Sequence, residues 1–456
     1  MSRLLVTHGT VVTAFPGTRD VVPAVIPDGA VVIEGDRIVA VGPAADLASR
    51  FADCKELDAR GGTIFPGLIN LHHHFYSSLA RGLDPGGAMG DFAGVLDGLW
   101  WRLDRALDGP TVRLSARLAL ADCVRWGCTT VFDHHASPSR IDGVLDDIAG
   151  CVEAAGLSAM LCYEITDRNG HDGALKGLRE NVRFLEARPG GRIRGLVGLH
   201  ASFTLGNETL AAVADHAGAG CHVHIAEDPV DGEASRSAFG KGPVERLADY
   251  GLLHAGSVLV HGIHLSDAEY DQVGESGAVL VHCPESNANN SVGRLDVDHV
   301  AGRGVGLGLG TDGMSSAMLG SLRAAFLTCR AAAGPNAGFD TVPALLGANA
   351  TVAGRLLGEP LLGEIAPGAP ADLMVLDAAP VTPMKPANLA GHLLYGYSEP
   401  PVRHTVARGE VLLRDFAHTR EDTVELSREA RAAAPALWER FGSMDRGTSF
   451  LGGKDV

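Results

Sequence analysis

Three consecutive histidines, His72, His73 and His74, follow the mostly apolar residues 66–71. If this segment is a β-strand, side chains two residues apart point to the same side. His72 and His74 can then converge on one metal ion while His73 points away, and imidazole is a common zinc ligand. A chance cluster, the scar of a tag or a surface patch would give the same letters. The other histidines and acids of the chain must decide between these alternatives.

Two further motifs supply the same kinds of ligand. His222 and His224 are again two residues apart, and Glu227 follows them; Asp312 lies in the sequence Gly-Thr-Asp-Gly at residues 310–313. His222 and His224 face the same side, so one of them is expected lower in the fold, and we assign His224 as the ligand. The expected metal ligands are His72, His74, His224 and Asp312.

Three imidazoles and one carboxylate leave a position for water, as catalytic zinc sites require. A divalent metal lowers the pKa of such a water to about 7, which would give metal-bound hydroxide as the nucleophile at neutral pH. The Glu227 carboxylate could take the water proton and pass it to a leaving group; the alternative is an acid near a helix N-terminus. His261 could polarise the substrate or stabilise an oxyanion. The expected catalytic residues are Glu227, His261 and Asp312.

Eight short apolar or β-branched segments lie between residues 62 and 360, and stretches rich in Ala, Leu and Arg alternate with them. Each segment ends in or just before an ionisable residue. A single such residue is usually a cap or loop residue, but eight in phase are hard to attribute to turns. Eight units over about 250 residues predict an α/β fold, a (β/α)8 TIM barrel, with its active site at the C-terminal strand ends. The ionisable residues at the ends of the eight segments are His72, Asp133, Glu164, His200, His224, His261, His282 and Asp312.

Both ends of the chain are rich in short β-segments separated by Gly and Asp, as in hairpins. The apolar periodicity of residues 422–441 predicts a helix that packs on the outside. We therefore predict residues 1–60 as the first part of a small β-domain, residues 61–362 as the metal-dependent barrel, and residues 363–456 as the second part with the C-terminal helix.

Composition limits the class of protein. Hydrophobic residues make up 46% and charged residues 20%, which is typical of a globular enzyme. The net charge of −17 disfavours a nucleic acid polymer as partner, because such surfaces are basic. We expect no membrane span and no signal peptide, since no apolar run approaches about 18 residues. Eight scattered cysteines without a CxxC pair indicate reduced thiols and a cytoplasmic location.

The ordered motifs resemble the amidohydrolase superfamily, in its branch of mononuclear deaminases and chlorohydrolases. The resemblance covers nearly the whole chain and implies a composite β-sandwich domain formed by both termini. The segments that carry it are residues 66–70 with His72 and His74, His224 with Glu227, His261, His282 with Ser286 and Asn287, Thr311 with Asp312, and residues 363–373.

The resemblance also implies a metal count. Dinuclear members of such barrels usually bridge their metals with a carboxylated lysine on strand four, but that segment here ends in His200, and the five lysines lie outside the strand segments. We therefore expect one divalent metal ion; zinc and iron both suit imidazole, and zinc is favoured. Residues 133–135, Asp-His-His, admit a second metal, although hydrogen bonds from such residues to metal ligands are a common alternative.

Residues 99–105, 132–138 and 199–204 look more narrowly like aminohydrolases linked to selenium-dependent purine metabolism. This resemblance implies deamination of a purine- or pyrimidine-like small molecule, a C–N bond that is not a peptide bond. Dechlorination or cyclic-amide opening on the same site is the alternative reaction. A non-catalytic scaffold would lack ligands, and a cytidine-deaminase type would need a CxxC pair. The oligomeric state stays open, although homo-oligomers are common among enzymes.

Five residues are predicted to contact the substrate, each with an alternative. Trp100 and Trp101 could stack on a flat ring or pack in the core. His282 could contact substrate or be a core histidine, and Asn287 could support the metal site or its loop. Asp167 and Arg168 are weaker candidates. The predicted contacts are His200, His282, Asn287, Trp101 and Arg81.

Overall fold

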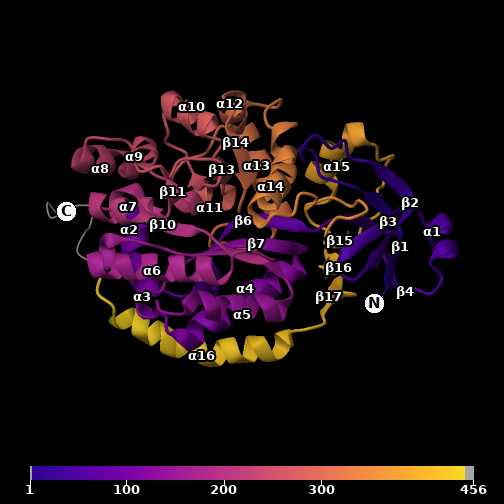
Figure 1. The fold of residues 1–456 in the computed structure, drawn as a ribbon, viewed down its shortest axis with the longest axis horizontal. Coiled ribbons are helices and arrows are strands. Elements are labelled where there is room, and N and C mark those ends of the chain that lie inside the picture. The colour runs from indigo at the N-terminus through magenta and orange to yellow at the C-terminus, as the bar shows by residue number, and fades with distance from the viewer. Residues whose placement is uncertain (1–2, 447–456) are drawn as a thin grey trace.

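The computed structural model describes residues 3–446, and its centre is a parallel β-barrel (Figure 1). Strands β6 to β9 form one parallel sheet and β10 to β14 another, and the isolated bridges His73–Asp312 and Ile165–Leu199 connect the two. The predicted (β/α)8 barrel is therefore confirmed. Only Leu196 separates β9 from β10, so these two segments form one interrupted strand and the barrel has eight. The segments are β6 (Leu68–His73), β7 (Cys128–His135), β8 (Ser158–Tyr163), β9 (Ile193–Gly195), β10 (Val197–Ala201), β11 (Cys221–Ile225), β12 (Val258–His261), β13 (Val279–His282) and β14 (Gly306–Leu309).

Helices surround the barrel, and their ends follow local sequence signals. Asp108 and Thr111 form a capping box at the start of α4, and Ser266 and Glu269 form another at α10, which ends at the left-handed Gly277. The helices are α4 (Gly109–Arg125), α5 (Val144–Ala155), α6 (His171–Ala187), α7 (Asn207–Ala214), α8 (Pro229–Phe239), α9 (Pro243–Asp249), α10 (Asp267–Ser276), α11 (Pro284–Asn289), α12 (Val297–Gly302), α13 (Met318–Ala333) and α14 (Thr341–Leu357).

Asn349, on α14, holds the first and last barrel strands together. Its Oδ1 accepts the Leu309 N–H at 2.8 Å, and its Nδ2 donates to the carbonyls of Ile69 (2.7 Å) and Leu309 (2.8 Å). The side chain is fully buried. A Cβ at Gly308 would lie 2.9 Å from Asn349 Oδ1, so glycine there lets the amide approach the strand. One side chain thus satisfies backbone groups of two strands that share only a single bridge.

The two termini pair in one nine-stranded sheet beside the barrel, on the right of Figure 1. β5 (Thr63–Pro66) lies between β1 and β15, so this sheet includes residues just beyond the predicted boundary at residue 60. The expected assembly of a β-rich domain from both ends of the chain is confirmed. Its other elements are β1 (Arg3–Val12), β2 (Val25–Glu34), β3 (Arg37–Pro43), α1 (Ala44–Arg50), β4 (Lys55–Asp58), β15 (Leu373–Leu376), α15 (Leu389–Gly396), β16 (Val402–Ala407), β17 (Glu410–Arg414) and β18 (Ala417–His418).

The connection from β6 to α4 contains η1 (Phe75–Ala80), α2 (Phe92–Val95), the π-helical turn η2 (Leu96–Trp100) and α3 (Trp101–Ala106). The C-terminal helix α16 (Thr423–Ser443) runs along α3 and α4, as Figure 1 shows in yellow. Arg102 on α3 donates to the carbonyls of Phe441 and Met444, each at 3.1 Å, and its guanidinium lies over the Phe441 ring. The predicted outer helix therefore holds the connection that follows the first barrel strand.

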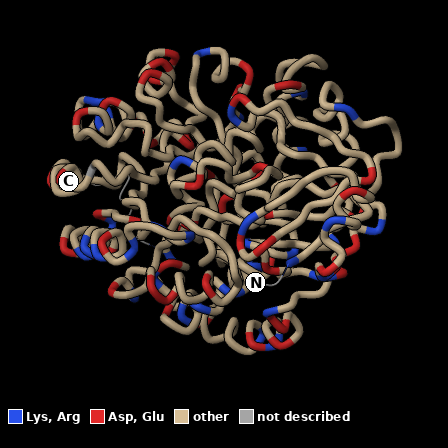
Figure 2. The backbone as a smooth tube through the Cα atoms, turned by 45° about the vertical axis from the view of Figure 1, so that its right-hand side comes forward, with Lys and Arg blue, Asp and Glu red and all other residues tan. Residues whose placement is uncertain are grey.

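Acidic and basic residues are interspersed along the chain (Figure 2). Within residues 3–446, no helix combines the length and the apolar character that a membrane crossing needs.

Candidate active site

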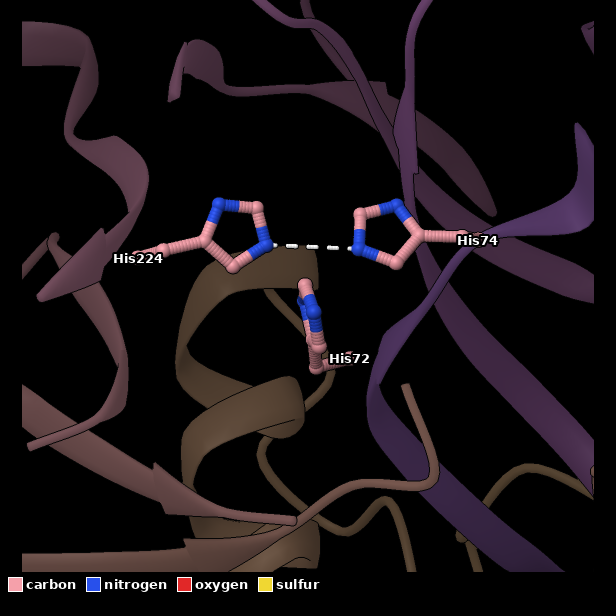
Figure 3. Close-up of side chains that lie close together, drawn as sticks. All are labelled: His72, His74 and His224. Carbon is pink, nitrogen blue, oxygen red and sulfur yellow. Dashed lines mark hydrogen bonds between the residues drawn. The ribbon is translucent and has the colours of Figure 1, made fainter. Parts of the chain in front are cut away.

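Three imidazoles converge at the C-terminal end of the barrel (Figure 3). His72 lies in β6, His74 directly follows this strand, and His224 comes from β11. His74 Nε2 and His224 Nε2 face each other at 3.3 Å, and each of the three rings offers a nitrogen within 4.8 Å of the others. His72 Nε2 is buried and makes no hydrogen bond in the described part of the chain.

This donor set fits a divalent cation. Nitrogens at 2.0–2.1 Å from a tetrahedral zinc ion are separated by about 3.3 Å, which matches the His74–His224 distance. Asp312 adds a carboxylate: its Oδ1 lies 3.2 Å from His74 Nε2 and 3.6 Å from His72 Nε2. The four predicted ligands thus lie close together, and the buried His72 Nε2, which has no hydrogen-bond partner among the described residues, fits the role of a ligand to such a cation.

Hydrogen bonds on the far side of each ring orient the three imidazoles. His74 Nδ1 donates to the His134 carbonyl at 2.6 Å, and His224 Nδ1 donates to the His200 carbonyl at 2.9 Å. His72 Nδ1 lies 2.9 Å from His222 Nε2. Such outer bonds fix the tautomer that leaves Nε2 free as a ligand. His222 therefore contacts a ligand ring from below, as expected for the lower of the two histidines on β11.

The neighbouring histidines have other contacts. His73 lies 3.2 Å from Ser316 Oγ through its Nε2 and is outside the cluster. His134 Nε2 lies 3.1 Å from each of the carbonyl oxygens of Leu199 and His222, while its Nδ1 is 3.6 Å from a Glu164 oxygen. His134 and Glu164 also bring one atom each near His224. The two carbonyl contacts of His134 favour the alternative in which this residue forms hydrogen bonds within the protein instead of binding a second metal.

Burial and one carboxylate set the charge of the cluster. Burial lowers the pKa of His72 to about 4 and that of His224 well below its usual value. Burial also disfavours charge on His74, but the hydrogen bond and charge of Asp312 outweigh it and raise this pKa to about 9. Burial would raise the pKa of Asp312, yet the hydrogen bonds from His72 and His74 hold it well below its usual range. At neutral pH, without a cation, His72 and His224 are neutral, Asp312 is ionised and His74 carries a proton, for which a bound cation would compete.

Glu227 lies just beyond β11 and faces the same space. Its Oε2 is 3.3 Å from His261 Nε2, and its Oε1 accepts from Asn290 Nδ2 at 3.2 Å. Burial raises the pKa of Glu227 to about 7. His261 Nδ1 donates to Asn287 Oδ1 at 2.8 Å, which leaves His261 Nε2 directed to Glu227 and, at 3.8 Å, to Asp312. A carboxyl group that exchanges a proton near neutral pH thus lies beside the ligand cluster.

Three strand ends around the site have left-handed backbone. φ is +45° at Ala226, +73° at His261 and +55° at Asp312. Residues with a Cβ disfavour this region, and such conformations gather at functional sites. The turns direct Glu227, His261 and Asp312 toward one point.

A cavity opens above the cluster, with about 70 Å³ of space for the centres of water-sized molecules. His74, His224, Glu227, His261 and Asp312 line it on the barrel side. An aromatic wall and a polar end complete the lining. The aromatic residues are Tyr76, Phe92, Trp100, Trp101 and Phe203, and the polar end contains Asp104, Glu164, Arg168 and His200.

The predicted substrate contacts divide into two groups. Trp101 and His200 line the cavity, whereas Arg81, His282 and Asn287 do not. Arg81 is exposed and pairs with Asp122 at 3.1 Å. His282 is buried, and Asn287 Oδ1 accepts from His261 Nδ1. A substrate contact by these three residues stays a prediction.

Sequence reasoning did not single out several cavity residues and underrated Arg168. Tyr76 lies in a helical segment without a recognisable motif, and Asp104 lies in residues 99–105, whose resemblance gave no role to this residue. Arg168 was only a weak candidate, and the Glu164 strand end four residues before it was the clue to its position.

Comparisons with known proteins agree with this geometry. The sequence pattern of the amidohydrolase family matches residues 63–412, and that of a bacterial imidazolonepropionase-like composite domain matches residues 29–53. A 5-methylthioadenosine/S-adenosylhomocysteine deaminase of Symbiobacterium thermophilum is 30% identical, covering 96% of this chain and 99% of that protein. A 5'-deoxyadenosine deaminase of Methanosarcina barkeri is also 30% identical, covering 97% and 100%.

Solved structures share the fold. An adenosine deaminase from Xanthomonas campestris with bound zinc has a TM-score of 0.82 at 24% identity, covering 97% of this chain and 99% of that one. Atrazine chlorohydrolase from Arthrobacter aurescens, complexed with zinc, has a TM-score of 0.80 at 23% identity, covering 95% and 100%.

Proposed function

We propose a function for this chain from the premise that it belongs to the amidohydrolase family, whose pattern spans most of its length. Its relatives across nearly the full chain are deaminases, so it is a hydrolase acting on C–N bonds other than peptide bonds. The proposed reaction is hydrolytic removal of an exocyclic amino group from a purine- or pyrimidine-like heterocycle, with release of ammonia. The position of the Glu227 carboxyl beside the ligand cluster and facing the cavity is the observation that carries the proposal.

His72, His74, His224 and Asp312 would hold one divalent cation, and zinc suits three imidazoles and a carboxylate with one open position. When bound, such a cation lowers the pKa of water so that a nucleophile is available at neutral pH. Iron suits the same ligands, and elemental analysis separates the two.

Glu227 is proposed to carry the proton. Its carboxylate takes a proton from the attacking water, and the carboxylic acid then gives it to the departing amino nitrogen, so that ammonia leaves and oxygen replaces it on the ring carbon. A pKa near neutrality suits both half-steps, because the ideal acid–base group has a pKa near the operating pH.

His261 is proposed to stabilise charge on the ring. Asn287 fixes its Nδ1–H, so only Nε2 is available on the cavity side. Its Nε2 lies 3.3 Å from Glu227 Oε2, and as an imidazolium, with a second proton on Nε2, His261 can donate from there to negative charge that develops when the ring carbon becomes tetrahedral. The aromatic wall excludes water and offers flat faces for a heterocycle.

The test combines elemental analysis with an ammonia-release panel of amino-heterocycles and their chlorinated and lactam analogues. We expect one metal per chain, and Glu227→Gln should lower kcat by about 10²–10⁴ without changing metal content. Glu233→Gln is the matched control, since Glu233 is exposed on α8. Two metals per chain would contradict the mononuclear site. Turnover of chloro-heterocycles or lactams without ammonia release would replace the proposed reaction.

A further inference from the structure

The short helix α11, which follows β13, presents one polar face toward the site. Pro284 begins the helix, where a missing N–H costs nothing. The N–H groups of Asn287 and Asn290 donate to the carbonyls of Cys283 (3.0 Å) and Ser286 (2.8 Å), which defines the helical turn. Ser286 and Asn290 are four residues apart, so their side chains lie on the same face. Ser286 is buried and Asn290 is half-buried.

Ser286 holds the carboxylate that is predicted to bind the metal. Its Oγ donates to Asp312 Oδ2 at 2.5 Å. The other oxygen, Oδ1, lies 3.2 Å from His74 Nε2 and 3.6 Å from His72 Nε2, and it accepts the Gly313 N–H at 2.7 Å. The two oxygens of Asp312 therefore have different neighbours, since one is bound to α11 and the other faces the ligand cluster.

Asn290 holds the proposed proton carrier. Its Nδ2 donates to Glu227 Oε1 at 3.2 Å, and its Oδ1 accepts from Asn289 Nδ2 at 3.0 Å, which sets the direction of the amide. Glu227 Oε2 lies on the other side, 3.3 Å from His261 Nε2. In the described part of the chain, Asn290 and His261 are the side chains that bond or pair with this carboxyl group.

The helix itself is fixed, so it can hold these groups at constant distances. Ser321 on α13 donates from its Oγ to Glu285 Oε2 at 2.5 Å. Asn290 Nδ2 also lies 3.4 Å from Ser286 Oγ, which connects the two side chains on the polar face. Glu227 and Asp312 come from two different strand ends, β11 and β14, and this pair of side chains is the contact that bridges them.

We propose that Ser286 and Asn290 are positioning residues with separate tasks. Ser286 fixes the angle of the Asp312 carboxylate toward the metal, and Asn290 fixes the Glu227 carboxyl group for proton transfer. The task of Asn290 rests on the proposed function, whereas the task of Ser286 rests only on the metal ligands. One helical turn then sets the position of the proton carrier relative to the metal.

Zinc affinity tests Ser286. Ser286→Ala should lower it by about 10–100-fold, because partners that orient a ligand have effects of this size. Ser286→Thr keeps the hydroxyl group and should restore most of the affinity. Competition between the metal-free full chain and a chromophoric chelator measures the change. Ser237→Ala is the matched control, since Ser237 is exposed on α8.

Steady-state kinetics test Asn290 on the amino-heterocycle that the wild-type enzyme deaminates fastest. Asn290→Ala should lower kcat by about 10–100-fold through misplacement of Glu227, with little change in KM or zinc affinity. Asn290→Asp keeps the shape but lacks the amide N–H, and it should lose kcat as well. Asn336→Ala is the control, since Asn336 is exposed. A crystal structure of zinc-loaded Asn290→Ala should show Glu227 turned away from His261.

The results distinguish this proposal from the proposed function. Wild-type zinc affinity in Ser286→Ala, or wild-type kcat in Asn290→Ala or Asn290→Asp, overturns the task of that residue. Loss of both zinc affinity and kcat in Asn290→Ala, with a lower melting temperature, shows a merely structural role and overturns the separation. If the wild-type enzyme releases no ammonia, the proposed reaction fails. The zinc competition and the crystal structure then still decide, and an unmoved Glu227 overturns the task of Asn290.

Discussion

Replacing Asn349 by alanine should weaken the closure of the barrel and, with it, the metal site. The substitution removes three hydrogen bonds and leaves the Leu309 N–H and the carbonyls of Ile69 and Leu309 buried without this partner. A buried polar group that loses its partner costs about 1–3 kcal/mol. The two carbonyls keep a second lone pair, so we take the low part of this range and expect a loss of about 3–6 kcal/mol. That loss is a large part of a typical stability of about 5–15 kcal/mol.

Calorimetric melting of the metal-loaded protein measures this effect. With an entropy of unfolding of about 2 cal/mol/K per residue, the melting temperature should fall by about 3–6 °C. Metal affinity should fall as well, because Asn349 connects β6, which carries His72 and leads to His74, to β14, which leads to Asp312. Asn336→Ala is the control, since Asn336 is exposed. A melting temperature for Asn349→Ala within one degree of this control would refute the reasoning.

Three other predictions concern the ligands, the substrate contacts and pH. His72→Ala should abolish stoichiometric metal binding while His73→Ala retains it, which elemental analysis after dialysis measures; equal loss in both would contradict the division between the two histidines. Arg81→Ala should leave kcat/KM within about twofold, because this side chain is outside the cavity; a larger loss in steady-state assays would support it as a substrate contact. Burial raises the pKa of Asp372 in the folded protein to about 6. Its favourable contribution to the free energy of unfolding is therefore complete below the pKa of the unfolded chain, about 4. This contribution is lost as the pH rises through about 6. Asp372→Asn should therefore flatten the fall in melting temperature between pH 4 and 7, and an unchanged slope would contradict this.

The barrel and the ligand cluster could be predicted because strand periodicity and side-chain chemistry coincide at the strand ends. His72 and His74 illustrate this, since their spacing places both rings on the same side, where they meet His224. Position along the strand was equally informative on β11, where the lower His222 contacts His72 and the higher His224 reaches the cluster. In each case a local rule determined the direction of the side chain.

The substrate contacts could not be predicted as well, because loop side chains have no such rule. Arg81 follows a short 3-10 helix whose exit angle decides its direction, and it points to Asp122. Asp104 belongs to a short helix, and its place on the cavity wall depends on how that helix packs against the rest of the fold. Arg168 is placed by its carboxylate partners, which are distant in sequence or on the preceding strand. Tertiary packing decides these positions.

The contact between α16 and α3 has a consequence for genetic variation in this protein. Asp104 and Trp101 face the cavity from α3, while Arg102 on the same short helix is bonded to carbonyls of Phe441 and Met444. A stop codon before residue 423 would leave every proposed metal ligand and Glu227 in place but remove the helix that supports this wall. Such alleles should be null for catalysis although their lesion is far from the reacting atoms, and C-terminal fusions need a spacer beyond this helix.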